Sequence, residues 1–162
     1  MKGEAMKLST KGKYGLIALA DLALAYNADP GDSFLVLRTI AEKRNISEAY
    51  LERIISRLKK AGIVITQRGS MGGYSLSSSP EEITVGRVLE VLEGPLDVCG
   101  CAADTEAAGN GCSRDDGKGC SRVESCVSKI VCEEINAKIA EAIGSMTIQD
   151  VLRRHHSIEE EM

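Results

Sequence analysis

Residues 37–76 read LRTIAEKRNISEAYLERIISRLKKAGIVITQRGSMGGYSL, and this stretch decides the fold. Apolar residues at helical spacing predict a short helix over 37–43. After a tight connection they predict a second helix, which Ser47 caps and which ends at Gly62. A helix, a short turn and a capped helix form the helix-turn-helix pattern, which we expect over 37–60.

A glycine-rich tip between two short apolar runs predicts an antiparallel hairpin, or wing, over 63–76. We expect Gly72 and Gly73 to supply positive φ angles at its turn. Arg68 is expected to project from the base of the wing. A guanidinium there can enter a narrow minor groove or hold a phosphate.

Two further helices are predicted outside this stretch. Upstream, apolar spacing predicts a helix over about 9–27, with Ser9 or Thr10 as its N-cap. Downstream, valine or isoleucine recurs every four residues between 123 and 143, which indicates a long amphipathic helix. The expected fold is therefore mostly α with a small β-hairpin: a winged helix-turn-helix domain over 6–95 and a long dimerisation helix.

All six cysteines follow the predicted wing, at Cys99, Cys101, Cys112, Cys120, Cys126 and Cys132. Clustered thiolates can hold a soft metal centre, and the even count also permits disulfides. We expect a cytoplasmic protein that is not attached to a membrane, because the first residues lack a signal-peptide core and no apolar stretch is long enough to span a bilayer. Since disulfides are uncommon in the cytosol, metal binding or redox chemistry is favoured over a disulfide framework.

The net charge of −4 conceals an asymmetry, because residues 6–79 carry +5 and residues 80–162 carry −9. A phosphate-facing surface is expected in the basic half. Scarce aromatic residues argue against a protein that stacks RNA or single-strand bases. No nucleophile, base and orienting group occur as a set, so we expect neither an enzyme nor a small-molecule substrate. We expect four glutamates to lie on solvated helix faces: Glu81, Glu82, Glu90 and Glu93.

The exposed face of the third predicted helix is the expected DNA reader. Arg53 can read guanine, and Glu52 can accept a hydrogen bond from cytosine. A solvated helix face and a winged helix that binds protein are the alternatives. The residues expected to contact double-stranded DNA are Thr10, Lys11, Ser47, Ala49, Tyr50, Glu52, Arg53, Arg57, Arg68, Gly72 and Gly73.

Several segments together resemble the Rrf-two-type bacterial transcriptional regulators, and in particular the IscR-like group. They are MKLSTKGKYGLIALADLAL, ISEAYLERIISRLKKAGIV, QRGSMGGYSL, ITVGRVLEVLEGP and SMTIQDVL. The resemblance covers about residues 6–152. It implies a homodimeric winged-helix regulator that binds a DNA operator.

In cluster-binding members of that group, three cysteines before the dimerisation helix hold an iron–sulfur cluster, here expected to be 2Fe–2S. The resemblance assigns the last two to Cys120 and Cys126 and the first to Cys101. Lys129 stands where IscR-like members carry a histidine, so Cys112 is the expected fourth ligand. Cys132 is expected to be a small buried core residue.

The expected layout after the winged helix is a cysteine-rich cluster loop over 96–120, a dimerisation helix and C-terminal helix over 121–152, and a flexible tail over 153–162. Two alternative functions stay open. One is a regulator of the same family that senses through thiols or a partner protein, as in cysteine metabolism, without a cluster. The other is a metal-binding interaction module that does not bind DNA.

Overall fold

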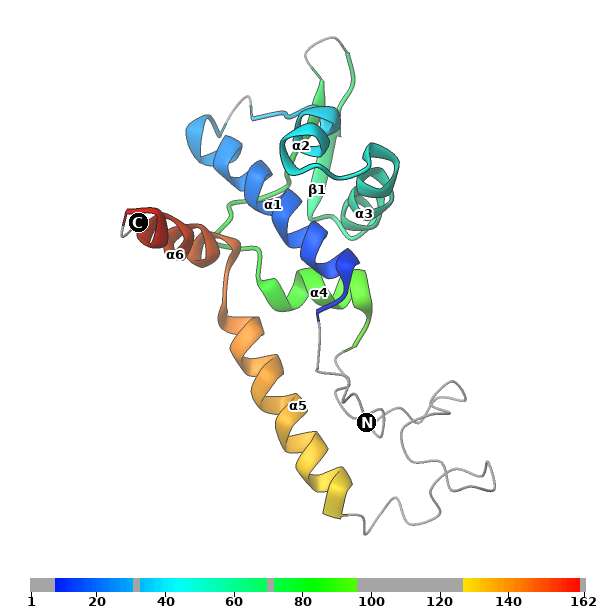
Figure 1. The fold of residues 1–162 in the computed structure, drawn as a ribbon, viewed down its shortest axis with the longest axis vertical. Helices are drawn as coiled ribbons and strands as arrows, with labels where there is room; N and C mark the ends of the chain where they lie inside the picture. The colour runs from blue at the N-terminus through cyan, green and yellow to red at the C-terminus, as the bar shows by residue number, and fades with distance from the viewer. Residues whose placement is uncertain (1–7, 31–32, 70–71, 96–126, 161–162) are drawn as a thin grey trace. The chain divides into compact units, whose positions relative to one another are not determined.

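The computed structural model describes residues 8–30, 33–69, 72–95 and 127–160 (Figure 1). Its elements are α1 (Thr10–Ala28), α2 (Leu37–Arg44), α3 (Glu48–Lys60), β1 (Val64–Gln67), β2 (Gly73–Leu76), α4 (Val85–Glu93), α5 (Val127–Ser145) and α6 (Ile148–Glu160). The predicted fold class is confirmed, because the described residues are mostly helical and β1 pairs with β2 as an antiparallel hairpin.

The ends of the first three helices follow local capping chemistry. Ser9 caps α1, and its hydroxyl accepts a hydrogen bond of 3.1 Å from the Gly12 N–H. Asn45 ends α2 in the left-handed conformation with φ of 52°, and Gly62 follows α3 with φ of 74°. Ser47 occupies the N-cap of α3 as predicted, but its side chain makes no capping hydrogen bond.

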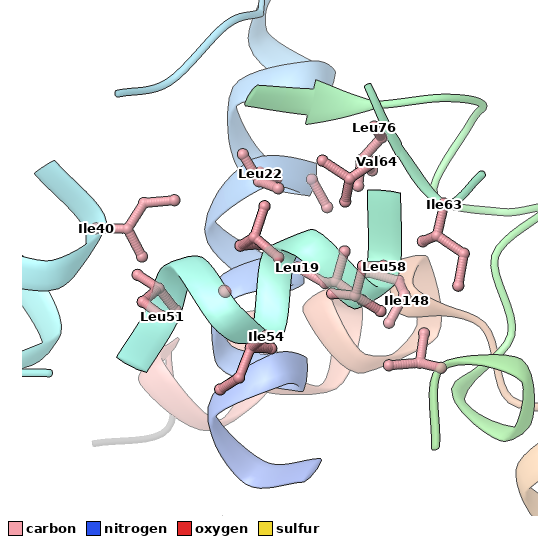
Figure 2. Packing of buried hydrophobic residues seen from close by; sticks show 14 of the residues in the cluster. Leu19, Leu22, Ile40, Leu51, Ile54, Leu58, Ile63, Val64, Leu76 and Ile148 are labelled. Atoms are coloured by element: carbon pink, nitrogen blue, oxygen red, sulfur yellow. The ribbon is translucent and has the colours of Figure 1, made fainter. Parts of the chain in front are cut away.

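The core fixes which side of α3 faces outward (Figure 2). Leu51 and Leu58 of α3 are fully buried, and they belong to the same cluster as Leu19 and Leu22 of α1. Burying each leucine contributes roughly 1.5–3 kcal/mol relative to leaving it exposed. Because the buried stripe holds one side of α3 against the core, the opposite side is exposed to solvent.

The C-terminal helix α6 belongs to the same compact unit, which comprises residues 7–94 and 143–162. Ile148 is buried in the core, and its N–H donates to the Ile83 carbonyl at 2.9 Å. Thr147 and Asp150 form a reciprocal cap at the start of α6. Residues 153–160 form the rest of α6.

Most of α5, up to Ala142, belongs to a second unit. No residue of α5, all of which the structure describes, is buried. Its exposed apolar side chains are Val127, Ile130, Val131 and Ile135, with 75%, 64%, 52% and 39% of their surface exposed. Among the described helices, none is long and apolar enough to cross a membrane.

Cys132 differs from its sequence-based expectation. We expected a free, buried cysteine, but Cys132 is half-buried and disulfide-bonded. The expectation that Cys132 is an inert hydrophobic residue is therefore wrong.

Candidate nucleic-acid interface

The outward side of α3 carries short polar and charged side chains beside its buried stripe. Ala49, Glu52 and Arg53 are exposed, as is Ser47 at the N-cap. An exposed guanidinium and an exposed carboxylate in adjacent positions offer a donor and an acceptor for base edges in a major groove. This side of α3 can therefore read duplex sequence.

Two other predicted contacts on α3 are engaged within the protein. Tyr50 is half-buried, and its ring lies nearly perpendicular to the ring of Tyr14, with the ring centres 6.0 Å apart. Arg57 donates from Nη1 to the carbonyl oxygen of Leu92 in α4 at 3.4 Å. The Tyr50 ring therefore packs within the protein, against Tyr14. Arg57 links α3 to α4.

Arg68 lies directly after β1, and its side chain is exposed. The hairpin pairs Val64 with Leu76 and Gln67 with Gly73. Both inner partners at the root of the hairpin, Val64 and Leu76, are buried in the core. The root is thus fixed while Arg68 stands at the far end of the strand, where it can reach a neighbouring groove or phosphate.

The glycines of the wing have a different role from the predicted one. Positive φ occurs at Gly69, with a value of 118°, and not at Gly72 or Gly73. Backbone atoms of Gln67 occupy the place where a side chain on Gly72 would begin. A Cβ on Gly73 would lie 2.6 Å from the Leu35 carbonyl oxygen. Gly72 and Gly73 are therefore needed for close backbone approach.

A contact that could not be predicted from sequence spacing joins α3 to the wing. Lys59 in the last turn of α3 donates to the Thr66 hydroxyl of β1 at 3.0 Å. Both residues are polar and sit in ordinary helix and strand positions, so their spacing alone carries no signal. The contact joins the end of α3 to the wing strand β1.

The start of α1 supplies the remaining predicted contacts. Thr10 is exposed and Lys11 is half-buried in the first turn of the helix. Ser9, just before them, donates to the Glu93 carboxylate from both its N–H and its hydroxyl, at 3.2 Å and 2.6 Å. Glu93 is exposed, as expected for a solvated helix face, and it also accepts hydrogen bonds from the residue that caps α1.

All eleven predicted DNA-contact residues lie in the unit that comprises residues 7–94 and 143–162. They come from the start of α1, the outer side of α3 and the wing. The predicted cluster ligands, Cys101, Cys112, Cys120 and Cys126, lie outside the described residues. Within the described part of the chain, no three His, Cys, Asp or Glu side chains form a group suited to a metal ion.

Known proteins with similar sequences are bacterial transcription factors. Residues 8–154 match the Rrf2 family, described as "Iron-dependent Transcriptional regulator". The HTH-type transcriptional regulator CymR of Bacillus subtilis is 44% identical over 103 residues, which cover 64% of this chain and 72% of that protein. IscR of Vibrio campbellii is 28% identical over 155 residues, which cover 95% of this chain and 82% of that protein.

Solved structures show the same two kinds of relative. The structure titled "T. potens IscR" matches with a TM-score of 0.68 and 34% identity, and covers 93% of this chain and 89% of that one. CymR, titled the global cysteine regulator of B. subtilis, matches with a TM-score of 0.68 and 31% identity, and covers 93% of this chain and 98% of that one. The chain therefore belongs to the Rrf2 family, whose members are DNA-binding transcriptional regulators and not enzymes.

Proposed function

We propose that this regulator is a homodimer whose affinity for a double-stranded operator depends on an iron–sulfur cluster, of the 2Fe–2S type. The cluster would be held by Cys101, Cys112, Cys120 and Cys126. This donor set fits, because thiolates are the usual ligands of such clusters. The single observation that carries the proposal is the cysteine-rich sequence that directly follows a winged-helix unit of known regulatory family. When bound, the cluster would supply one-electron redox chemistry and sensitivity to oxidants.

The reading surface in this proposal consists of the outer side of α3 and the wing. Arg53 and Glu52 would meet base edges, and Arg68 would meet the minor groove or a phosphate. The remaining predicted contacts would position the unit on the DNA backbone. Their support is the exposure of Glu52, Arg53 and Arg68 and the net charge of +5 over residues 6–79.

Dimerisation in this proposal uses α5. Its exposed apolar side chains, Val127, Ile130, Val131 and Ile135, recur at helical spacing. A contiguous apolar stripe is costly to leave in water, and a second copy of the same helix would remove it from solvent. Two copies would present two reading surfaces to an operator of two-fold character.

A second candidate function is favoured by the disulfide at Cys132. In this alternative the cysteines sense by thiol chemistry and hold no cluster. Two thiols would lose two protons and transfer two electrons to an oxidant such as a peroxide or a small disulfide, and an S–S bond would form. The similarity to CymR, described as the global cysteine regulator of B. subtilis, gives this alternative its second support.

Anaerobic purification separates the two candidates. A cluster predicts a coloured protein with visible absorbance and with iron and sulfide in comparable amounts. The thiol alternative predicts a colourless protein, in which mass analysis under non-reducing conditions finds Cys132 in a disulfide that an added reductant removes. Colourless protein without bound iron, even after anaerobic reconstitution with ferrous iron and sulfide, would contradict the cluster proposal.

A further inference from the structure

The last turn of α4 is the point where the winged-helix unit leads into the cysteine segment. α4 ends at Glu93, and Gly94 follows with φ of 94° and its N–H bonded to the Glu90 carbonyl at 2.9 Å. The first cysteine follows five residues later, at Cys99. The end of α4 is therefore the point at which the chain leaves the described unit toward the cysteines.

A first contact joins this turn to the start of α1. The Glu93 carboxylate accepts from the Ser9 N–H at 3.2 Å and from the Ser9 hydroxyl at 2.6 Å. The same hydroxyl accepts from the Gly12 N–H at 3.1 Å, which caps α1. Glu93 thus orients the residue that caps α1, directly before the predicted DNA contacts Thr10 and Lys11.

A second contact joins the same turn to the reading helix. The carbonyl of Leu92 accepts from Arg57 of α3 at 3.4 Å. Arg57 is one turn beyond Arg53 on α3. A movement of the last turn of α4 would therefore be felt by α3 as well as by α1.

Close packing makes this junction stiff. A Cβ at Gly15 would collide with the buried Leu92 side chain, whereas a Cβ at Gly12 would meet only the flexible end of the exposed Glu93 side chain. Leu92 is only 1% exposed. Because packed interiors leave little room for independent movement, α1 and the end of α4 shift together.

We propose that the last turn of α4 couples the cysteine segment to the DNA-facing elements, with Glu93 as the positioning residue. This inference rests on the proposed function, because it requires DNA affinity to depend on the state of the cysteines. A change at the cysteines that displaces Glu93 alters the cap of α1 and the hydrogen bond between Arg57 and Leu92. Both consequences bear on predicted DNA contacts through contiguous bonded groups.

The test measures a ratio of affinities. Operator fragments are selected with wild-type protein from a random duplex library. Dissociation constants are then measured anaerobically for protein reconstituted with ferrous iron and sulfide, for reduced apo-protein and for oxidised apo-protein. The ratio between the tightest and weakest of these states is the coupling factor. Glu93→Ala and Ser9→Ala remove the contact from its two sides, and Glu93→Gln keeps an acceptor without the charge.

Glu90→Ala is the matched control, because Glu90 lies one turn earlier on α4 and pairs with Arg87 of the same helix. Circular dichroism confirms that each variant is folded. If Glu93→Ala does not fold, Ser9→Ala and Glu93→Gln provide the test. We expect Glu93→Ala and Ser9→Ala each to reduce the coupling factor by about threefold or more, while Glu90→Ala leaves it unchanged; such a reduction is a modest part of typical allosteric coupling.

Two results would overturn the inference in different ways. Weaker binding by the same factor in every state, with an unchanged coupling factor, would show that the contact only supports the fold, and the proposed function would stand. A wild-type coupling factor of one would remove the proposed function and the inference together.

Discussion

Arg44 at the end of α2 holds the carboxylate of Asp21 in α1 through two hydrogen bonds, from Nε to Oδ2 at 2.7 Å and from Nη2 to Oδ1 at 2.8 Å. Lys43 adds a third, also at 2.8 Å. The Asp21 side chain is only 3% exposed. Its burial acts to raise the pKa of Asp21, but the hydrogen bonds from Arg44 and Lys43 outweigh burial, so the pKa lies below its usual value.

Asp21→Asn should destabilise the protein at neutral pH by about 1–3 kcal/mol, because it removes a buried, charge-assisted set of hydrogen bonds. Since the folded-state pKa of Asp21 is lowered, its contribution is complete above its ordinary value of 3.8 and is lost as the pH falls through the lowered pKa. Urea unfolding of both proteins across this range measures the effect. Glu42→Gln, which alters an exposed pair with Arg38, is the control and should change stability little. A difference between wild type and Asp21→Asn that does not shrink in acid would contradict this explanation.

Arg68→Ala should weaken operator binding by about 1–3 kcal/mol if the guanidinium makes a groove contact. The dependence of affinity on salt should also become shallower, because fewer counterions are released. Titrations at several salt concentrations measure both effects. Arg87→Ala is the control, since Arg87 lies on α4 and outside the predicted interface. Equal binding by Arg68→Ala and wild type would remove the wing from the proposed interface.

Val131→Glu should convert the dimer to monomer, or make the protein insoluble, because it places a charge in the proposed seam between two α5 helices. Val131 is half-exposed in the single chain, so the substitution leaves the fold of one protomer undisturbed. Ala140→Glu introduces the same charge on the opposite side of α5, because nine residues at about 100° each place Ala140 about 180° from Val131, and it should leave the dimer intact. Light scattering after gel filtration measures the mass. An unchanged dimer for Val131→Glu would assign dimerisation to another surface.

Cys120→Ser and Cys126→Ser should each abolish the visible absorbance of anaerobically purified protein, because both are proposed cluster ligands. Cys132→Ser should keep that absorbance, since Cys132 lies outside the proposed ligand set. If Cys132→Ser alone removed the colour, the ligand set would have to include Cys132. If no variant were coloured and Cys132→Ser abolished the response of DNA binding to oxidants, the thiol alternative would be favoured.

Patterns within short stretches of sequence predicted much of the fold. The buried residues of α3 follow the stripe that its spacing indicated, and Leu51 and Leu58 are fully buried. Ser9 caps α1 because a hydroxyl before a helix satisfies an orphan N–H, a rule that acts over three residues. Such features depend on neighbours along the chain, so the sequence displays them directly.

Contacts between distant residues could not be predicted in this way. Ser9 and Glu93 are 84 positions apart, and Asp21 and Arg44 are 23 apart. No periodic pattern in the sequence marks either pair, because the way the helices pack decides which residues meet. The expected role of the wing glycines was wrong for a related reason. Gly73 has no room for a side chain because the Leu35 carbonyl, on another segment, lies close to it. The residue preferences of turns do not predict such a contact.

The most direct test of the central claim is the affinity for one operator duplex before and after a single change at the cysteines. The same anaerobic preparation is divided, one half is reconstituted with ferrous iron and sulfide, and the other is kept as reduced apo-protein. Both are titrated with DNA at the same salt concentration. The proposal predicts dissociation constants that differ by about tenfold or more, within the usual range of allosteric coupling. Equal dissociation constants for a reconstituted sample shown to contain iron and sulfide would contradict it.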